Sequence, residues 1–183
     1  MSYMKIFDLL DLQLIEKVKK IKLLICDVDG VLTDGLIYMG NAGEELKAFH
    51  VRDGFGIHAI HQLGILTALI TGRESKIVEE RAKTLKIDFV FQGQSDKSIA
   101  FDHLCKQTQL KPDQIAYIGD DLIDLPVMNR VGLSVAVADA HPLVSQSVDY
   151  ITSLHGGKGA VREVCDLLLY AHNQLSVAKG LSV

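Results

Sequence analysis

Short apolar segments alternate with stretches of helical periodicity along most of this chain, and this alternation restricts the possible folds more than any other feature. The apolar segments, which we expect to be strands, are residues 21–26, 65–70, 89–91, 115–118 and 134–137. The segments expected to be helices are residues 9–18, 55–63, 75–85, 96–107, 121–131 and 160–171. Apolar strands separated by helices of roughly 10–15 residues indicate βαβ units. We therefore predict an α/β fold, a Rossmann-like parallel sheet with helices on both faces.

One segment departs from this alternation. Residues 36–39 and 45–49 have strand character and flank the sequence Gly40-Asn41-Ala42-Gly43. Glycine and asparagine favour the tight turn of a β-hairpin. Because this hairpin, at about residues 36–49, directly follows the first strand, we expect it to project from the carboxyl edge of the sheet.

Length and composition indicate a single soluble domain over residues 1–183, with a flexible tail at about residues 176–183. The net charge of −4 disfavours a broad nucleic-acid surface. No apolar run reaches the roughly 18 residues that a membrane span needs, and the N-terminus does not resemble a signal peptide. We therefore expect a cytoplasmic protein with neither a nucleic-acid nor a membrane partner, and three reduced, packed cysteines.

Polar residues follow several of the predicted strands, at the edge where open parallel sheets bind ligands. They are Asp27-Val28-Asp29-Gly30, Thr71-Gly72-Arg73 and Gly119-Asp120-Asp121, and Lys97 opens a neighbouring helix. Each could be ordinary by itself: the Asp pair a capped turn, Thr71 a helix cap and Lys97 a solvated lysine. Four carboxylates at one edge, however, would repel one another without a cation, and hard oxygen ligands suit Mg²⁺.

These residue types fit phosphate-ester hydrolysis. A carboxylate can attack phosphorus and form an acyl phosphate, while a metal ion neutralises the approaching charges. A second carboxyl group must protonate the leaving alkoxide and later activate water. Thr71 and Lys97 supply a hydroxyl and an ammonium for the phosphoryl oxygens, and Gly30 and Gly72 let backbone N–H groups approach an anion.

The four motifs resemble those of the haloacid dehalogenase superfamily of phosphohydrolases. By that resemblance Asp27 is the nucleophile, Asp29 the acid/base, Thr71 a phosphate-binding residue, and Lys97 the residue that holds nucleophile and phosphate together. The metal ligands are then the carboxylates of Asp27 and Asp120 and the backbone carbonyl of Asp29. Asp124 is expected either to orient Lys97 or to hold a metal-bound water.

The spacing of the motifs indicates a capless member of that superfamily. Residues 34–53 hold only the hairpin, and residues 71–97 hold one helix and one short strand, so neither segment can form a cap domain. The site would be open to water unless a neighbouring subunit covered it. We therefore expect a homo-oligomer, a tetramer.

Three segments resemble one subfamily, the 3-deoxy-D-manno-octulosonate 8-phosphate phosphatases of lipopolysaccharide synthesis. They are Asp-Val-Asp-Gly-Val-Leu-Thr-Asp-Gly at residues 27–35, His50-Val51-Arg52-Asp53-Gly54, and Gly-Gly-Lys-Gly-Ala-Val-Arg-Glu at residues 156–163. The resemblance implies Mg²⁺-dependent release of phosphate from this sugar acid phosphate, and a tetramer with hairpins packed between subunits.

An anionic sugar needs local cations in a chain of negative net charge. Arg73, two residues after Thr71, is the strongest candidate for the sugar carboxylate or hydroxyls. The resemblance also implies that residues 50–54 and His58 contact the sugar. The predicted substrate-binding residues are Asp29, His50, Val51, Arg52, Asp53, Gly54, His58, Gly72, Arg73, Arg81 and Lys97.

Some alternatives stay open at this level. Arg81 could be a solvated helix residue, or could face the site from the same or a neighbouring subunit. The 156–159 segment is either an ordinary helix-start loop or a lid that brings Lys158 to the substrate. The substrate could instead be a related nine-carbon sugar acid phosphate. A non-catalytic assembly module, similar to the C-terminal domain of nucleotidyl-sugar synthetases, is disfavoured because Asp27, Asp29, Lys97 and Asp120 are all present.

Overall fold

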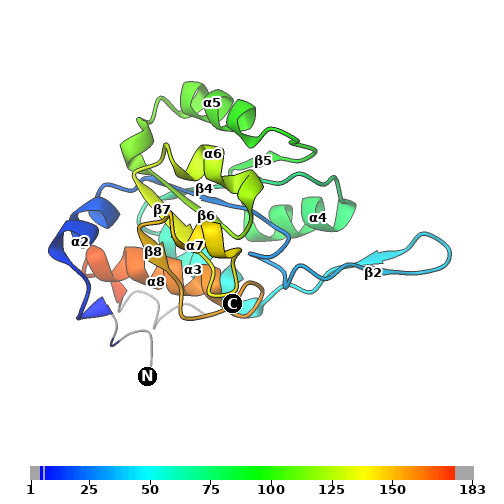
Figure 1. Cartoon of the computed structure of the whole chain (residues 1–183), viewed down its shortest axis with the longest axis horizontal. Coiled ribbons are helices and arrows are strands. Elements are labelled where there is room, and N and C mark those ends of the chain that lie inside the picture. Colours follow the sequence, from blue (N-terminus) through cyan, green and yellow to red (C-terminus); the bar gives the residue numbers. More distant parts are fainter. Residues whose placement is uncertain (1–4, 6, 176–183) are drawn as a thin grey trace.

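The computed structural model describes residue 5 and residues 7–175, and a six-stranded sheet organises this part of the chain (Figure 1). The strand order is β5-β4-β1-β6-β7-β8, and all neighbours run parallel. The strands are β1 (Leu23–Cys26), β4 (Leu66–Ile70), β5 (Phe89–Phe91), β6 (Ile115–Gly119), β7 (Leu133–Ala136) and β8 (Tyr150–Ile151). The predicted α/β fold is confirmed, and the central strand β1 carries Asp27 at its carboxyl end.

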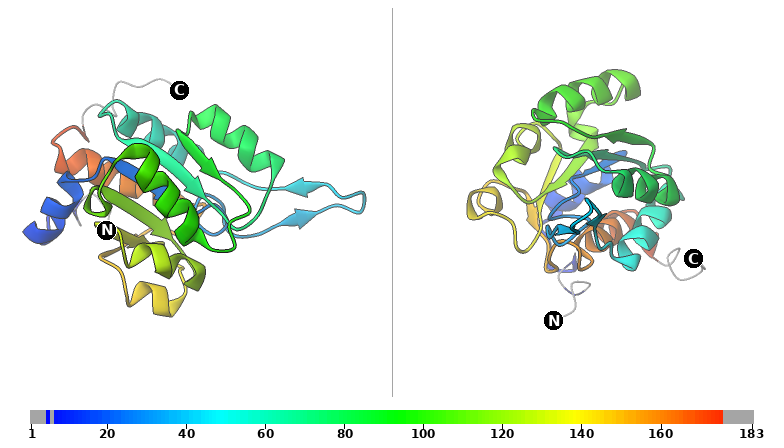
Figure 2. Two further views of the ribbon diagram at one scale, coloured as in Figure 1. Left: turned by 90° about the horizontal axis from the view of Figure 1, so that it is seen from above. Right: turned by 90° about the vertical axis from the view of Figure 1, so that its right-hand side faces the viewer.

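Helices cover both faces of the sheet, as Figure 2 shows. One face packs against α2 (Leu12–Lys19), α3 (Val51–His61), α4 (Lys76–Leu85) and α8 (Ala160–Ala171). The other face packs against α5 (Lys97–Thr108), α6 (Leu125–Met128) and α7 (Pro142–Ser145). Each helix lies where it can bury an apolar stripe against the strands.

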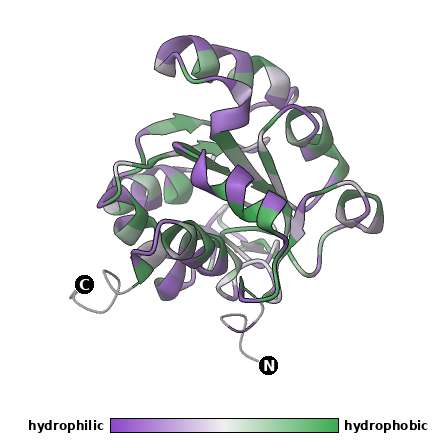
Figure 3. Ribbon diagram, turned by 90° about the vertical axis from the view of Figure 1, so that its left-hand side faces the viewer, coloured by the Kyte–Doolittle hydropathy of each residue, from purple (hydrophilic) through white to green (hydrophobic). Residues whose placement is uncertain are grey.

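Strand β1 shows why the sheet is buried on both sides. Leu24 and Cys26 belong to the apolar core on the α3 and α8 face, whereas Leu23 and Ile25 belong to the core on the α5 face. Successive side chains of a strand point to opposite faces, so a strand that is apolar at every position fits only between two helix layers. Hydropathy colouring agrees, because the strands are largely apolar (Figure 3).

The predicted hairpin is present and stands away from the sheet (Figure 1). Its strands β2 (Tyr38–Met39) and β3 (Glu45–Leu46) are antiparallel and pair Tyr38 with Leu46 and Met39 with Glu45. Both strands are shorter than expected, and they form a sheet of their own. Exposed apolar side chains lie along the hairpin and its approach: Leu36, Tyr38, Met39 and Leu46.

Several element boundaries differ from the sequence predictions. The helix expected at residues 55–63 begins at Val51, because the His50 side chain accepts a hydrogen bond from the Arg52 N–H and caps it. The helix expected at residues 121–131 is a 3₁₀ turn, η2 (Leu122–Asp124), followed by the short α6. The 3₁₀ turn η1 (Pro112–Gln114), α7 and β8 were not predicted.

Two sequence expectations concern the ends of the chain and its relation to membranes. The helix expected from residue 9 is α2, which begins at Leu12 with Asp11 as its N-cap. The tail expected at about residues 176–183 lies outside the described residues. Within the described part, none of the helices has the length and apolar character that crossing a bilayer requires.

Candidate active site

The predicted catalytic residues meet at the carboxyl edge of the sheet. Asp27 follows β1 and donates its backbone N–H to Ile118 O of the neighbouring strand β6 at 3.0 Å. Lys97 is the first residue of α5, and its ammonium lies 2.8 Å from Asp27 Oδ1. Both side chains are largely buried. The predicted contact between the nucleophile and the motif lysine is therefore present.

Asp124 holds this arrangement together from η2. Its Oδ1 accepts hydrogen bonds from Lys97 Nζ at 2.7 Å and from the Tyr117 hydroxyl at 2.6 Å. Its Oδ2 accepts from the backbone N–H groups of Asp120 at 3.0 Å and Asp121 at 3.2 Å. Of the two roles expected for Asp124, orienting Lys97 is the one that this geometry supports, because four donors already occupy the carboxylate.

Carboxylate oxygens of Asp27, Asp120 and Asp124 lie within 4.8 Å of one another. Since Asp124 is saturated by its donors, Asp27 and Asp120 are the side chains left to hold a cation. Asp120 Oδ1 is buried and accepts no hydrogen bond from the described residues. A Cβ on Gly30 would lie 2.2 Å from Asp120 Oδ2, so only glycine leaves room for this carboxylate. Such a donor set fits Mg²⁺, which binds few protein oxygens and keeps its waters.

The pKa values of the clustered side chains also favour a bound cation. Burial and the neighbouring Asp124 raise the pKa of Asp27 to about 6, although Lys97 opposes the rise. Burial, together with Asp27 and Asp124, raises the pKa of Asp120 to about 8. Burial lowers the pKa of Lys97, but the two aspartates Asp27 and Asp124 outweigh it and the net shift is upward. These carboxylates are thus crowded, and a divalent cation would relieve their repulsion.

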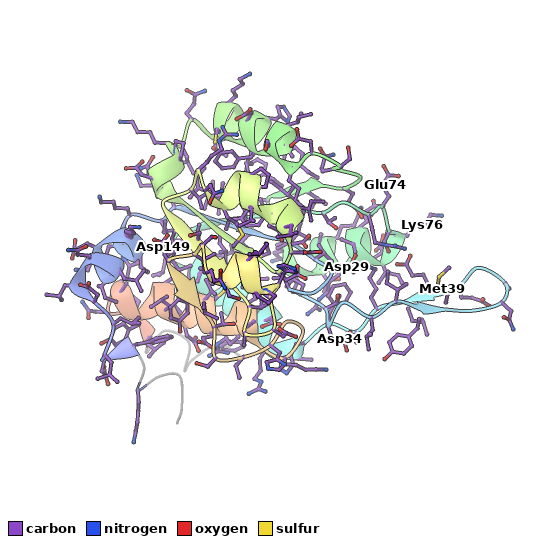
Figure 4. The ribbon with its side chains drawn as sticks, viewed as in Figure 1. Asp29, Asp34, Met39, Glu74, Lys76 and Asp149 are labelled. Carbon is purple, nitrogen blue, oxygen red and sulfur yellow. The ribbon has the colours of Figure 1, made fainter. Side chains whose placement is uncertain are left out.

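Asp29, the expected acid/base, lies at the root of the hairpin (Figure 4). Its Oδ1 contacts the ammonium of Lys47, which follows β3, and lies 3.5 Å from the Thr33 hydroxyl. Lys47 was not among the predicted site residues. No motif marks it, and its contact with Asp29 depends on how the hairpin folds back.

The second motif follows β4 as expected. Thr71 is buried, its N–H donates to Phe91 O at 2.9 Å, and its carbonyl accepts from Gln94 N–H at 3.0 Å. Gly72 and Arg73 are exposed. A Cβ built on Gly72 would lie 3.6 Å from Cδ1 of Ile123, a residue of η2, so η2 lies beside this loop. Arg73 therefore has freedom to reach a ligand.

A glycine-rich loop closes over the segment that carries Asp27 and Asp29. Gly157 N–H donates to Val31 O at 2.8 Å, and a Cβ on Gly156 would lie only 1.7 Å from Gly30 O. Gly156 N–H in turn donates to Asp139 Oδ1 at 2.9 Å. These contacts favour the interpretation of residues 156–159 as an ordinary loop at the start of a helix rather than as a lid. Lys158 is exposed and lies 3.6 Å from Asp34.

The predicted sugar-binding segment, residues 50–54, opens α3. Within it Asp53 is only 1% exposed, and its Oδ1 accepts the Arg162 N–H in the first turn of α8 at 2.8 Å. Burial raises the pKa of Asp53 to about 6, against the lowering effect of that hydrogen bond and of nearby arginines. Asp53 therefore joins α3 to α8, whereas Val51 and Arg52 are exposed.

Four of the predicted residues, Val51, Gly54, His58 and Arg81, line a pocket of about 240 Å³ between α3 and α4. The Arg81 guanidinium lies 5.5 Å from the centre of the Phe49 ring. The pocket lining includes neither Asp27 nor Lys97. The structure thus groups the predicted residues into one cluster at the strand ends and a second cluster between the two helices.

Comparison with known proteins places this geometry in a family. Residues 86–164 match the haloacid dehalogenase-like hydrolase family. The 3-deoxy-D-manno-octulosonate 8-phosphate phosphatase KdsC of Yersinia pestis is 60% identical over 169 residues, which cover 92% of this chain and 90% of the relative. The corresponding protein of Escherichia coli K12 has the same identity and coverage.

Solved structures agree. The crystal structure of the Yersinia pestis phosphatase is 58% identical, superposes with a TM-score of 0.92, and the match covers 95% of this chain and 94% of that one. The Moraxella catarrhalis phosphatase, crystallised with magnesium, phosphate and KDO, is 45% identical with a TM-score of 0.88, and the match covers 90% and 94% of the two chains. This chain belongs to the 3-deoxy-D-manno-octulosonate 8-phosphate phosphatase family of haloacid dehalogenase-like hydrolases.

Proposed function

We propose that this protein hydrolyses 3-deoxy-D-manno-octulosonate 8-phosphate to the free sugar acid and inorganic phosphate, a step of lipopolysaccharide synthesis. The observation that carries the proposal is the cluster at the strand ends, where Asp27 lies 2.8 Å from Lys97 and beside the buried, unpaired oxygen of Asp120. A non-catalytic module would have no need to keep these buried charges together, since they are expensive to bury.

The cofactor is Mg²⁺. The side chains of Asp27 and Asp120 and the backbone carbonyl of Asp29 would hold it. When bound, the ion supplies positive charge that screens the nucleophile from the anionic phosphoryl group. The Moraxella catarrhalis relative contains magnesium and phosphate together, which supports this assignment.

The protein residues divide the reaction into two steps. Asp27 attacks phosphorus, the bond from phosphorus to the ester oxygen breaks, and Asp29 gives that oxygen a proton. Asp29 then takes a proton from water as the water attacks the aspartyl phosphate and frees Asp27. Lys97 and Thr71 hold the phosphoryl oxygens throughout, and Lys97 also fixes the direction of the Asp27 carboxylate.

The sugar would be bound by the remaining predicted residues. Arg73 is exposed beside the phosphate-binding Thr71, which makes it the best-placed cation for the sugar carboxylate. His50 and Arg52, at the start of α3, add hydrogen-bonding and positive groups for the sugar. We assign Gly54, His58 and Arg81 to the sugar or to a neighbouring subunit's site, since they line the pocket between α3 and α4.

We further propose one domain over residues 1–183 that assembles as a tetramer. The hairpin exposes Tyr38, Met39 and Leu46, and contiguous apolar side chains on a projecting element favour a protein partner. The described segments between the motifs contain no cap domain, so a second copy would also shield the site from water. A phosphorylated sugar acid cannot cross a bilayer unaided, so the enzyme belongs in the cytoplasm.

The test is phosphate release from a panel of phosphorylated sugar acids, with and without EDTA. We expect 3-deoxy-D-manno-octulosonate 8-phosphate to give the highest kcat/KM, EDTA to abolish release, and added Mg²⁺ to restore it. Asp27→Asn should abolish turnover with an unchanged circular dichroism spectrum, while Asp102→Asn, an exposed control on α5, should not. A preference for a nine-carbon sugar acid phosphate would favour the alternative substrate, and an active Asp27→Asn would refute the nucleophile.

A further inference from the structure

A second buried lysine lies beside the proposed catalytic residues, and it comes from the hairpin. The side chain of Lys47 is 0% exposed, although the hairpin itself stands out from the sheet. Its ammonium contacts Asp29 Oδ1 and lies 3.5 Å from Glu45 Oε1. A lysine without its own function would keep its ammonium in water, because burying that charge is unfavourable. Lys47 instead directs it to one carboxylate.

The contacts of Asp29 are asymmetric. The Lys47 ammonium contacts Oδ1, and the Thr33 hydroxyl, which also faces Val28 O at 3.4 Å, lies 3.5 Å from the same oxygen. Oδ2 accepts no hydrogen bond from the described residues. Thr33 is fixed in turn, since it is buried and its Oγ1 accepts the Gly35 N–H at 3.2 Å. The ion pair with Lys47 fixes one oxygen of the carboxyl group and leaves the other oxygen available to a reacting group.

The arrangement repeats the one at the nucleophile. There Lys97 is held by Asp124 and fixes Asp27; here Lys47 has Glu45 nearby and fixes Asp29. Resting on the proposed function, we infer that Lys47 is a positioning residue for Asp29, through which the hairpin aims the proton donor at the leaving oxygen. Lys47 acts through Asp29 and exchanges no proton with the substrate.

The inference can be separated from a merely structural role by changing the leaving group. An alkoxide needs a proton as it departs, whereas p-nitrophenolate is a weak base and leaves without one. The ratio kcat/KM reports the steps up to departure of the leaving group. If Asp29 is displaced, kcat/KM should therefore fall for the sugar phosphate, whereas kcat/KM for p-nitrophenyl phosphate should stay nearly unchanged.

The experiment compares the full-length parent with Lys47→Met on both substrates. General acid catalysis contributes about 10²- to 10⁴-fold. We expect Lys47→Met to lower kcat/KM on 3-deoxy-D-manno-octulosonate 8-phosphate by about 100-fold, and on p-nitrophenyl phosphate by no more than about threefold. Lys47→Arg, which keeps the cation, should recover part of the loss. Retained aryl phosphatase activity also reports that the variant is folded.

Two further variants make the result decisive. Asp29→Asn should show the same selective loss. Lys83→Met removes an exposed lysine paired with Glu79 and Glu80 on α4, and should behave as the parent on both substrates. If Lys47→Met lowered kcat/KM equally on both substrates while Asp29→Asn lowered it only on the sugar phosphate, the role of Lys47 would be refuted. The proposed function would not be affected.

Two other outcomes would contradict the proposed function itself. Equal losses in Asp29→Asn would refute the acid/base assignment and the role of Lys47 with it. A parent that released no phosphate from the sugar substrate would refute the proposed substrate, and the comparison would then use an alkyl phosphate that the parent does cleave.

Discussion

Asp124 explains how several charged side chains can share one edge of the sheet. It is fully buried and accepts from Lys97, Tyr117 and two backbone N–H groups, so its charge is spread over four donors. A Cβ on Gly119 would lie 2.5 Å from its Oδ2, so the preceding strand must end in glycine. The position of Lys97, and with it that of Asp27, therefore depends on a residue that need not touch the substrate.

Replacing Asp124 by Asn should test this dependence. Asn has one acceptor oxygen and adds an NH₂ group, which would face either Lys97 or the two backbone donors. Breaking a buried charge pair costs about 3–5 kcal/mol, and we expect the free energy of unfolding to fall by about that amount. Urea unfolding measures the change. Asp102→Asn, which removes only an exposed contact with Arg130, is the control, and equal small effects in both variants would contradict the argument.

Asp53 should make stability depend on pH. Its pKa is raised to about 6 by burial, so the folded state holds its proton more tightly than the unfolded state does. That contribution is present below the ordinary carboxyl pKa and is lost as the pH rises from about 4 through 6, by about 3 kcal/mol at most. Asp53→Asn keeps an acceptor for the Arg162 N–H and removes the titration.

Urea unfolding from pH 4 to pH 7 should therefore show a smaller decline in stability for Asp53→Asn than for the parent. Asp27 and Asp120 remain in both proteins and cancel in the difference. Parallel curves for the two proteins would show that Asp53 does not titrate in this range.

At the scale of elements, the loop before α8 and the loop after β1 lock together through glycines. Gly156 and Gly157 approach the backbone of Gly30, Val31 and Thr33 so closely that no side chain fits between them. Helix α8 also packs along α3, the largest interhelical contact of the core. The loop that carries Asp27 and Asp29, the proposed catalytic aspartates, is thus supported from the far end of the described chain.

Gly156→Ala should disturb both stability and turnover. Its Cβ would meet Gly30 O at 1.7 Å, so the two loops must separate, and Asp27 and Asp29 lose their support. We expect a loss of more than about 2 kcal/mol in the free energy of unfolding, because both neighbours are backbone atoms. Phosphate release should fall as well.

Gly64→Ala is the matched control. Gly64 has a φ of +71° but no neighbour within 4 Å of a new Cβ, so only backbone strain of about 1 kcal/mol is expected. If Gly156→Ala were no more destabilising than Gly64→Ala, the loops would not be locked as described.

The sequence predicted the long elements and the motif residues but not every short element. Residues 89–91 and 160–171 were predicted with their observed bounds, because a buried strand and a long amphipathic helix have clear periodicity. β8 has only two residues and α7 only four, too few for any period to appear. The helix expected from residue 121 was interrupted because the Asp121 side chain caps a 3₁₀ turn and Pro126 follows within α6.

Site prediction has a similar limit. Asp27, Thr71, Lys97 and Asp120 were identifiable because strand order brings successive strand ends together. The contacts of Lys47 with Asp29 and of Asp53 with Arg162 join distant segments at angles set by tertiary packing, which no local pattern encodes. The same holds for the pocket of Gly54, His58 and Arg81.

At the scale of the whole molecule, the exposed apolar side chains of the hairpin favour assembly with other copies of the chain. We expect light scattering to give the mass of a tetramer for the parent, and a smaller mass for Met39→Glu combined with Leu46→Glu. Charges placed on both hairpin strands would have to be buried at a subunit contact, which is unfavourable. Ile99→Glu, an exposed position on α5, should leave the mass unchanged. A monomeric parent would refute the assembly.

The close packing of Gly156 and Gly157 against the segment after β1, called the clamp below, also has a consequence for synthesis of the protein. A ribosome releases Asp27 early, but the partner strand β6 and the clamping loop emerge much later. A nascent chain therefore carries its proposed nucleophile with no finished pocket around it, and residues 156–157 must have emerged before hydrolysis can begin. Truncation upstream of the clamp should yield an inert polypeptide rather than a weakened enzyme.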